Sequence, residues 1–225
     1  MAASAQDAVQ LPDFGSSAEA LATPDEERQA GEGMLRELRG MNYVLDDPLM
    51  VEYIDALGYR LVAQTDSPEH QFTFFVVRSE IINAFAAPGG YVGVHTGLIV
   101  MAENESELAA VLAHECAHIT QKHILRYFES LKNASLPIML AMLGALIAAQ
   151  GAGSGDAAQA AVVGGTALMQ QQAINFTRHN EYESDRIGIH TLAQAGYDPM
   201  AMATFFSRME RALRSNGEGD RKSVV

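Results

Sequence analysis

The sequence predicts an α+β fold that is mainly helical and contains one small β-sheet. Stretches with apolar residues at helical spacing occupy the beginning and the second half of the chain, whereas short aromatic and β-branched runs are confined to residues 71–95. With 225 residues, the chain is long enough to form one domain around a substantial hydrophobic core.

The charge balance argues against two classes of partner. A net charge of −13 at pH 7 is unfavourable for binding nucleic acid and for a basic membrane-binding surface. Cys116 is the single cysteine, so no disulfide can form within the chain. Residues 1–6 contain no basic region followed by an apolar run, and we therefore expect no signal peptide in this sequence; such a start equally fits a mature exported chain.

Two helices are expected in the first third of the chain. Residues 1–24 have no apolar periodicity, and we expect them to form an extended N-terminal arm. The acidic residues after Pro24 are typical of a first helical turn, because negative charge there stabilises the helix dipole. A second helix should begin at Pro48, after Asp47, and end near Gln64. Its apolar side chains fit one buried face: Val51, Ile54, Leu57 and Leu61.

The predicted sheet follows directly. Residues 71–78 are aromatic and β-branched, which predicts a strand. A short second strand is expected at Asn83–Ala86, then a turn at 88–90 that contains two glycines, then a third strand at Tyr91–His95. These segments predict a small, hairpin-like sheet.

The next helix should carry the chemistry of the protein. Asn104 and Glu107 have the spacing of a capping box and predict a helix over about residues 105–131. The most apolar stretch of the chain, residues 136–149, comes after it. This stretch is shorter than the roughly 20 residues that span a bilayer, and a proline and a glycine interrupt it, so a buried or interfacial segment is favoured over a membrane span.

Two helices are predicted in the last third. The first covers about residues 175–195 and stops at Gly196, a residue type that favours helix ends. The second follows Asp198 and Pro199, which suit a helix start, and should end near residue 214.

Residues 114–118 read HECAH and match the H-E-x-x-H pattern inside a predicted helix. At about 100° per residue, His114 and His118 lie about 40° apart, so both rings can bind one ion. A catalytic zinc ion needs three protein ligands and a water molecule. Glu115 is placed to take the proton of that water as it attacks a carbonyl. The pattern predicts two metal ligands and a catalytic base.

Two nearby residues are poor candidates for the third ligand. His123 falls about 140° around the helix from His118 if the helix is continuous, so its ring should point away from the ion. Cys116 lies roughly opposite the two histidines and is better interpreted as a small buried apolar residue.

An acidic segment in a later helix supplies a better candidate. Glu181 and Asp185 are four residues apart and therefore share a helix face. A carboxylate ligand from a second helix, with an aspartate that orients a ligand imidazole, is a common arrangement around zinc. Spacing alone leaves Glu183 as an alternative to Glu181, and a solvated acidic face as the alternative to a metal site.

Three motifs together resemble the M48 family of zinc metallopeptidases and, within it, the periplasmic β-barrel assembly-enhancing proteases. They are INAFAAPGG at residues 82–90, HECAH at 114–118 and NEYESDRIG at 180–188. The resemblance implies a zincin-like domain over residues 25–225 that binds one Zn²⁺ ion. It also implies that Glu181 is the third ligand and that Asp185 assists catalysis by hydrogen-bonding a ligand histidine.

The resemblance also implies how substrate is bound. The strand formed by Asn83, Ala84, Phe85 and Ala86 would be the edge on which an extended peptide is laid, as in β-augmentation. An ordinary hairpin strand is the alternative. Residues 134–172 would be a mobile lid over the site or a membrane-facing segment, with a packed helical hairpin as the alternative.

From these features we expect a zinc-dependent endopeptidase that acts on exported or misfolded outer-membrane proteins in the periplasm of a Gram-negative bacterium. Relatives of this type continue into a C-terminal domain of TPR repeats that binds the outer-membrane assembly machinery, and no such repeat occurs in this sequence. The partners expected are a polypeptide substrate and at most a peripheral membrane contact. The alternative is a chaperone-like interaction module whose zinc site is mainly structural.

Overall fold

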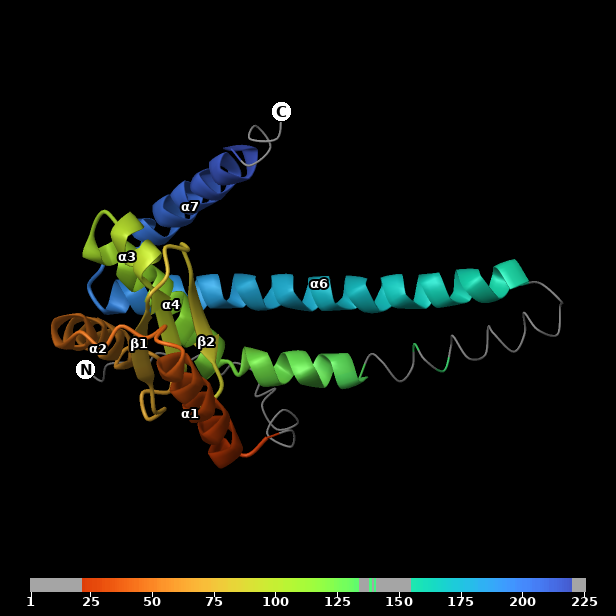
Figure 1. Ribbon diagram of the computed structural model, residues 1–225, viewed down its shortest axis with the longest axis horizontal. Helices are drawn as coiled ribbons and strands as arrows, with labels where there is room; N and C mark the ends of the chain where they lie inside the picture. The colour runs from red at the N-terminus through yellow and green to blue at the C-terminus, as the bar shows by residue number, and fades with distance from the viewer. Residues whose placement is uncertain (1–21, 134–137, 139, 141–154, 220–225) are drawn as a thin grey trace, which may run out of the picture.

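The computed structural model describes residues 22–133, 138, 140 and 155–219 and confirms a mainly helical protein with one small sheet (Figure 1). An unlabelled helix covers residues 123–133. The labelled elements are α1 (Pro24–Gly40), α2 (Pro48–Val62), β1 (Thr73–Val77), β2 (Ala84–Ala87), β3 (Tyr91–His95), α3 (Thr96–Met101), α4 (Glu105–Thr120), α6 (Gly155–Gln194) and α7 (Met200–Gly219).

The first two helices begin where the sequence predicts. Thr23 and Glu26 form a complete capping box at the start of α1, with Pro24 in the first turn. The Asp47 carboxylate accepts hydrogen bonds from two backbone N–H groups in the first turn of α2. Side chains that satisfy the free N–H groups therefore determine both boundaries.

The sheet has the order β1-β3-β2, which the expected hairpin describes only in part. β2 and β3 are antiparallel and form the hairpin, with Gly89 and Gly90 at positive φ in the turn. β1 instead pairs in parallel with β3, on the side away from β2. In this order β2 pairs only with β3 and forms an edge of the sheet, although it lies between β1 and β3 in the sequence.

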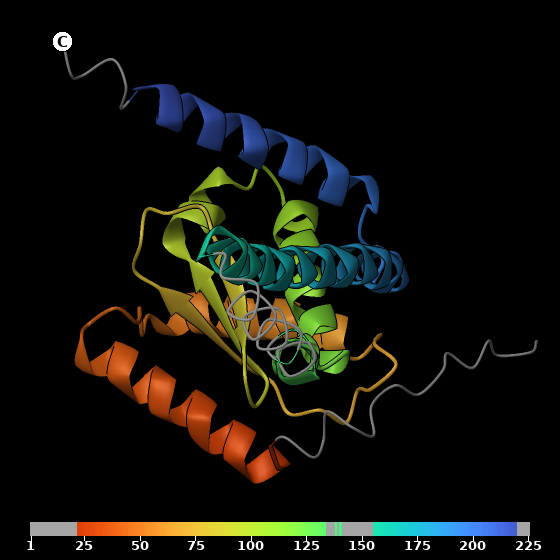
Figure 2. The same cartoon turned by 90° about the vertical axis from the view of Figure 1, so that its right-hand side faces the viewer.

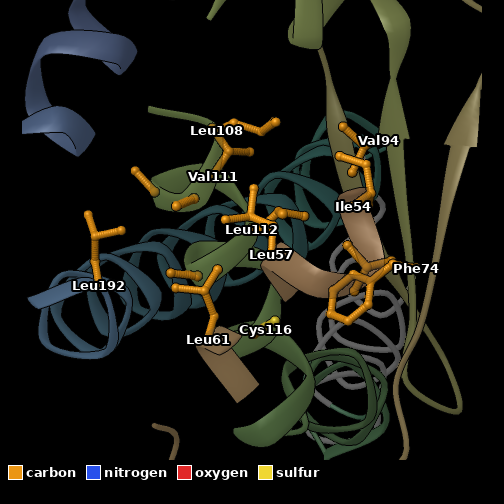
Figure 3. Packing of buried hydrophobic residues seen from close by; sticks show 14 of the residues in the cluster. Ile54, Leu57, Leu61, Phe74, Val94, Leu108, Val111, Leu112, Cys116 and Leu192 are labelled. Atoms are coloured by element: carbon orange, nitrogen blue, oxygen red, sulfur yellow. The ribbon is translucent and has the colours of Figure 1, made fainter. Parts of the chain in front are cut away.

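The sheet separates two groups of buried side chains. On one face, α1 covers the side chains of Phe75, Val77 and Tyr91. The other face packs against α2 and α4 and, through them, against α6 and α7. Figure 2 shows α1 on one side of the sheet, and Figure 3 shows the larger group, with residues of α2, α4 and the strands in one cluster. Successive side chains of β1 point alternately into these two groups, as expected for a strand that is buried on both faces.

The predicted helix over residues 105–131 is wrong in one respect. Asn104 caps its start as expected, by accepting a hydrogen bond from the Glu107 N–H group. The helix then ends at Thr120, because Lys122 adopts a positive φ of 52° and its N–H group bonds to the Ile119 carbonyl. A new helix begins at residue 123. Neither glycine nor proline marks this break, so the sequence carried no signal for it.

The last two helices are longer than the sequence predicts. α6 begins at Gly155 and so includes part of the segment that the sequence assigned to a lid; its N-terminal part extends beyond the core (Figure 1). It ends before Gly196, which has a φ of +84°. The Asp198 carboxylate accepts a hydrogen bond from the Met200 N–H group at the start of α7. The expected arm (1–24) lies almost entirely outside the described residues, and the expected lid (134–172) is described only at 138, 140 and 155–172. Within the described residues, no helix is both long and apolar enough to span a bilayer.

A buried ion pair joins α7 to α4. Glu107 is 3% exposed, and Arg208 donates a hydrogen bond to each of its carboxylate oxygens. The Glu103 N–H group donates a third, at 2.8 Å. Arg208 also donates to the Met101 carbonyl, so its guanidinium ties together the connection before α4 and the helix that follows α6. Such a carboxylate is tolerated in the core because its partners are all in place.

We predict that Arg208→Met destabilises the protein by about 3 kcal/mol at neutral pH, because the Glu107 charge would remain buried without its partner. The hydrogen bonds from Arg208 lower the pKa of Glu107. Their stabilising effect is therefore complete above the carboxyl pKa of the unfolded chain, about 4.3, and is lost as the pH falls through the lower folded value.

Urea unfolding of wild type and variant at pH 7 and in acid tests this prediction. Arg211→Met changes an exposed arginine of the same helix and should cost less than about 0.5 kcal/mol. An equal effect of the two substitutions at pH 7, or a cost of Arg208→Met that does not shrink in acid, would contradict the role of the ion pair.

Candidate active site

Three metal-binding side chains come together between α4 and α6. His114 and His118 lie one turn apart on α4, and their Nε2 atoms are 3.0 Å apart. Glu181 of α6 places Oε2 at 3.3 Å from Nε2 of His114 and Oε1 at 3.7 Å from Nε2 of His118. This is the grouping that the sequence predicts, and Glu181 follows His118 by more than sixty positions in the chain.

The spacing and chemistry of these atoms suit zinc. Ligand atoms at about 2.0–2.1 Å from a tetrahedral zinc ion lie about 3.3 Å from one another, close to the three observed separations. Two imidazoles and one carboxylate are a common ligand set of catalytic zinc, which leaves a fourth position for water or substrate. The residues present therefore fit the expected ion.

Close packing of α6 on α4 brings the carboxylate to the histidines. Gly188 lies on the same face of α6 as Glu181 and Asp185, at helical spacings of three and seven residues. A Cβ atom at Gly188 would lie 3.1 Å from the backbone nitrogen of His114 and 2.9 Å from Cε of Met202. The missing side chain allows the two helix backbones to approach one another at the level of the site.

Asp185 fixes the orientation of His114, as expected from the resemblance. Its Oδ1 atom is 2.9 Å from Nδ1 of His114, so the imidazole holds its proton there and presents Nε2 to the ligand group. The Phe206 ring packs edge-on against the same imidazole, with centroids 5.5 Å apart. Burial opposes the charged form of His114, but hydrogen bonds to Asp185 and Glu181 raise its pKa to about 9.

His118 has the opposite protonation tendency. Burial, together with the neighbouring His114 and His123, lowers its pKa to about 4. In the absence of a metal, the additional proton that makes an imidazolium therefore favours His114, and His118 favours the neutral form. Metal binding displaces it, since a ligand imidazole must offer a lone pair.

Glu115 lies in the same cavity as the ligand cluster. The Ala86 N–H group donates a hydrogen bond to its carboxylate, and burial raises its pKa to about 7. A carboxylate with a pKa near neutrality can both accept and return a proton. The cavity has a volume of about 280 Å³ and is lined by Asn83, Ala84, Leu98, Val111, His114, Glu115, Glu181, Asp185, Phe206 and Met209.

The four residues of the expected substrate strand have different surroundings. Asn83 and Ala84 line the cavity. Ala86 reaches the site through its backbone, by the bond to Glu115. The Phe85 ring turns to the other face of the sheet, where it packs edge-on against Phe75 and His95. The strand therefore borders the cavity, with the Phe85 side chain directed away from it.

The structure places His123 differently from the continuous-helix prediction. Because α4 breaks at Lys122, the His123 ring turns back, and its Nδ1 atom lies 3.0 Å from Nδ1 of His118. His123 does not belong to the group of metal-binding side chains, as the sequence predicts. The sequence did not predict that its ring would contact His118. Glu183 bonds to His123 and Arg126 and does not replace Glu181. Cys116 is fully buried in the core, as predicted.

Comparisons with known proteins agree with this geometry. The family model for Peptidase family M48 matches residues 48–219. A putative beta-barrel assembly-enhancing protease of Vibrio cholerae is 46% identical over 208 residues, which cover 92% of this chain and 43% of that protein. The beta-barrel assembly-enhancing protease of Escherichia coli K12 is 41% identical over 199 residues, which cover 88% of this chain and 40% of the relative.

A more distant relative is mitochondrial. The metalloendopeptidase OMA1 of Schizosaccharomyces pombe is 32% identical over 166 residues, which cover 74% of this chain and 46% of that protein. The chain thus spans less than half the length of each of these relatives. The matched region contains the ligand cluster and Glu115.

We predict that Gly188→Ala weakens zinc binding by about tenfold, because the added methyl group would push α6 away from the His114 backbone. Gly164→Ala is the matched control: a Cβ atom at this glycine of the same helix meets nothing within 4 Å. It should leave zinc affinity unchanged and slightly favour the helix. Zinc titration against a competing chelator measures both variants. Equal affinity of Gly188→Ala and Gly164→Ala would show that close packing is not required.

Proposed function

Because the chain belongs to peptidase family M48, we propose that it is a zinc-dependent endopeptidase that cleaves exported or misfolded outer-membrane proteins in the periplasm. The observation that carries the proposal is the shared cavity, in which a complete ligand set adjoins a buried glutamate. A bound zinc ion would supply a Lewis acid for the scissile carbonyl and make the attacking water more acidic.

The protein's own residues would provide the remaining steps. His114, His118 and Glu181 hold the ion, and Asp185 keeps the His114 ring in the orientation that binds it. Glu115 accepts the proton of the attacking water and then delivers it to the leaving amine. Its raised pKa suits both steps near neutral pH, and the bond from Ala86 holds the carboxylate in place.

The edge of β2 that faces away from β3 suits an extended peptide at Ala84. The Asn83 carbonyl accepts a hydrogen bond from the His95 N–H group on β3. Because backbone groups alternate in direction along an antiparallel strand, those of Ala84 point away from β3 and toward the open edge. A substrate could therefore pair with β2 beside the ligand cluster, as in β-augmentation.

The cavity has an apolar wall that favours an apolar substrate side chain. Leu98, Val111, Phe206 and Met209 contribute to this wall, close to the ligand His114. Strands of misfolded outer-membrane barrels alternate apolar and polar residues, so they offer both an extended backbone and apolar side chains. The names of the bacterial relatives agree with such substrates. Contact with the outer-membrane assembly machinery is proposed from the resemblance alone.

The alternative chaperone-like module would need the ligands but has no use for Glu115. We predict that Glu115→Gln retains zinc and loses cleavage by a factor of about 10²–10⁴, the usual contribution of a general base. Glu52→Gln, the same change on the exposed face of α2, should leave both unchanged. Zinc content and cleavage of casein and of an unfolded outer-membrane barrel protein are measured side by side. Cleavage by Glu115→Gln at the wild-type rate would refute the mechanism.

The apolar wall yields a separate prediction about specificity. Met209→Lys should lower kcat/KM for a peptide with leucine beside the scissile bond by about 10–100-fold, because the pocket loses apolar contact and gains a charge. Cleavage of the matching aspartate peptide should rise. Met200→Lys introduces the same charge at a methionine of α7 that is 65% exposed. If both variants change the leucine-to-aspartate ratio equally, Met209 does not determine specificity.

A further inference from the structure

The two ligand histidines are supported in different ways. Nδ1 of His114 lies 2.9 Å from the Asp185 carboxylate, a direct imidazole–carboxylate bond. Among the described residues, Nδ1 of His118 meets no carboxylate; it lies 3.0 Å from Nδ1 of a third histidine, His123. That histidine is 3% exposed, and its Nε2 atom lies 3.0 Å from Oε2 of Glu183.

Only one arrangement of protons satisfies this chain of contacts. If Nε2 of His118 is to bind a metal, its proton must sit on Nδ1, which then donates to Nδ1 of His123. His123 must in turn hold its proton on Nε2, where it donates to Glu183. The reverse arrangement would place a proton on the metal-facing nitrogen of His118 and set the lone pair of His123 against a carboxylate.

Neighbouring groups fix the outer end of the chain. Arg126 donates to Oε2 of Glu183 at 2.9 Å, so the carboxylate is charged, paired and held in position. The hydroxyl of Ser184 is fully buried and lies 3.2 Å from Nδ1 of His123, a contact that a hydroxyl can make as donor or as acceptor. The contact with the charged Glu183 carboxylate therefore selects the tautomer of His123 that holds its proton on Nε2 and leaves Nδ1 as an acceptor.

The break in α4 creates this arrangement. His123 and Arg126 belong to the helix that begins after the positive φ of Lys122, whereas Glu183 and Ser184 belong to α6. Side chains from both helices therefore converge on the outer side of His118. Glu183 occupies this position while Glu181, two residues earlier, faces the ligands.

We propose that His123 is a positioning residue, which holds His118 in its metal-binding tautomer and orientation and is itself anchored by Glu183 and Arg126. The inference rests on the proposed zinc site but concerns residues outside the ligand set. In this arrangement a carboxylate supports each ligand histidine: Asp185 contacts His114 directly, whereas Glu183 acts on His118 through His123.

The experiment measures zinc affinity and the visible spectrum of the cobalt-substituted protein. His123→Leu removes the acceptor and should weaken zinc binding by about 10–100-fold and alter the cobalt spectrum. His123→Asn places an amide oxygen near the former Nδ1 position and should restore affinity to within about fivefold of wild type. His190→Leu, at an exposed histidine of α6, is the matched control and should change neither quantity.

A double substitution tests the relay itself. Glu183→Gln should weaken zinc binding less than His123→Leu, and combining the two should cost no more than His123→Leu alone, because the carboxylate acts only through His123. Thermal unfolding of the metal-free variants separates positioning from packing, since a packing defect lowers that stability and leaves zinc affinity unchanged.

Several results would overturn the inference. These are wild-type zinc affinity in His123→Leu, an Asn variant as weak as the Leu variant, or additive effects of the double substitution. If His123→Leu fails to fold, unchanged affinity in Glu183→Gln decides against the relay. Failure of the proposed peptidase is distinguishable: the zinc affinities would still depend on His123, but no substrate would be cleaved.

Discussion

The close contact between α4 and α6 is the constraint on which the site depends. His114 and His118 are local to one helix, and helical spacing alone brings them together. Glu181 can join them only if the second helix approaches within the distance that Gly188 permits. The same approach sets Asp185 against His114 and Glu183 against His123. One packing contact thus determines the ligand set and the groups that orient it.

The site gathers several charges in a largely buried region, and pairing makes that possible. Glu107 is compensated by Arg208, and Glu183 by Arg126 and the His123 N–H group. Glu115 differs, because burial raises its pKa despite the attraction of His114 and a hydrogen bond from the neutral Ala86 N–H group. Of these three carboxylates, the one whose pKa is raised is therefore the one whose proposed task is to exchange protons.

Much of the fold and of the ligand set could be predicted because the signals are local. Thr23, Asp47 and Asn104 mark helix starts through side-chain caps, and the spacing of His114 and His118 needs only helical geometry. The parallel pairing of β1 could not be predicted, since strand order depends on long-range packing. The position of His123 was missed because its direction follows from a positive φ at a lysine, a residue with no preference for that conformation.

A hydrogen bond links the edge strand β2 to Glu115, the proposed catalytic base. The Ala86 N–H group holds Glu115, and two residues earlier in β2 the backbone of Ala84 faces the open edge where a peptide could pair. A shift of β2 on substrate binding would therefore move the hydrogen-bond donor of the base as well. Because β3 holds the opposite edge of β2 through its backbone bonds, such a shift is restrained. Through β2, the small sheet would thus align the scissile bond of the substrate with Glu115, the proposed proton acceptor.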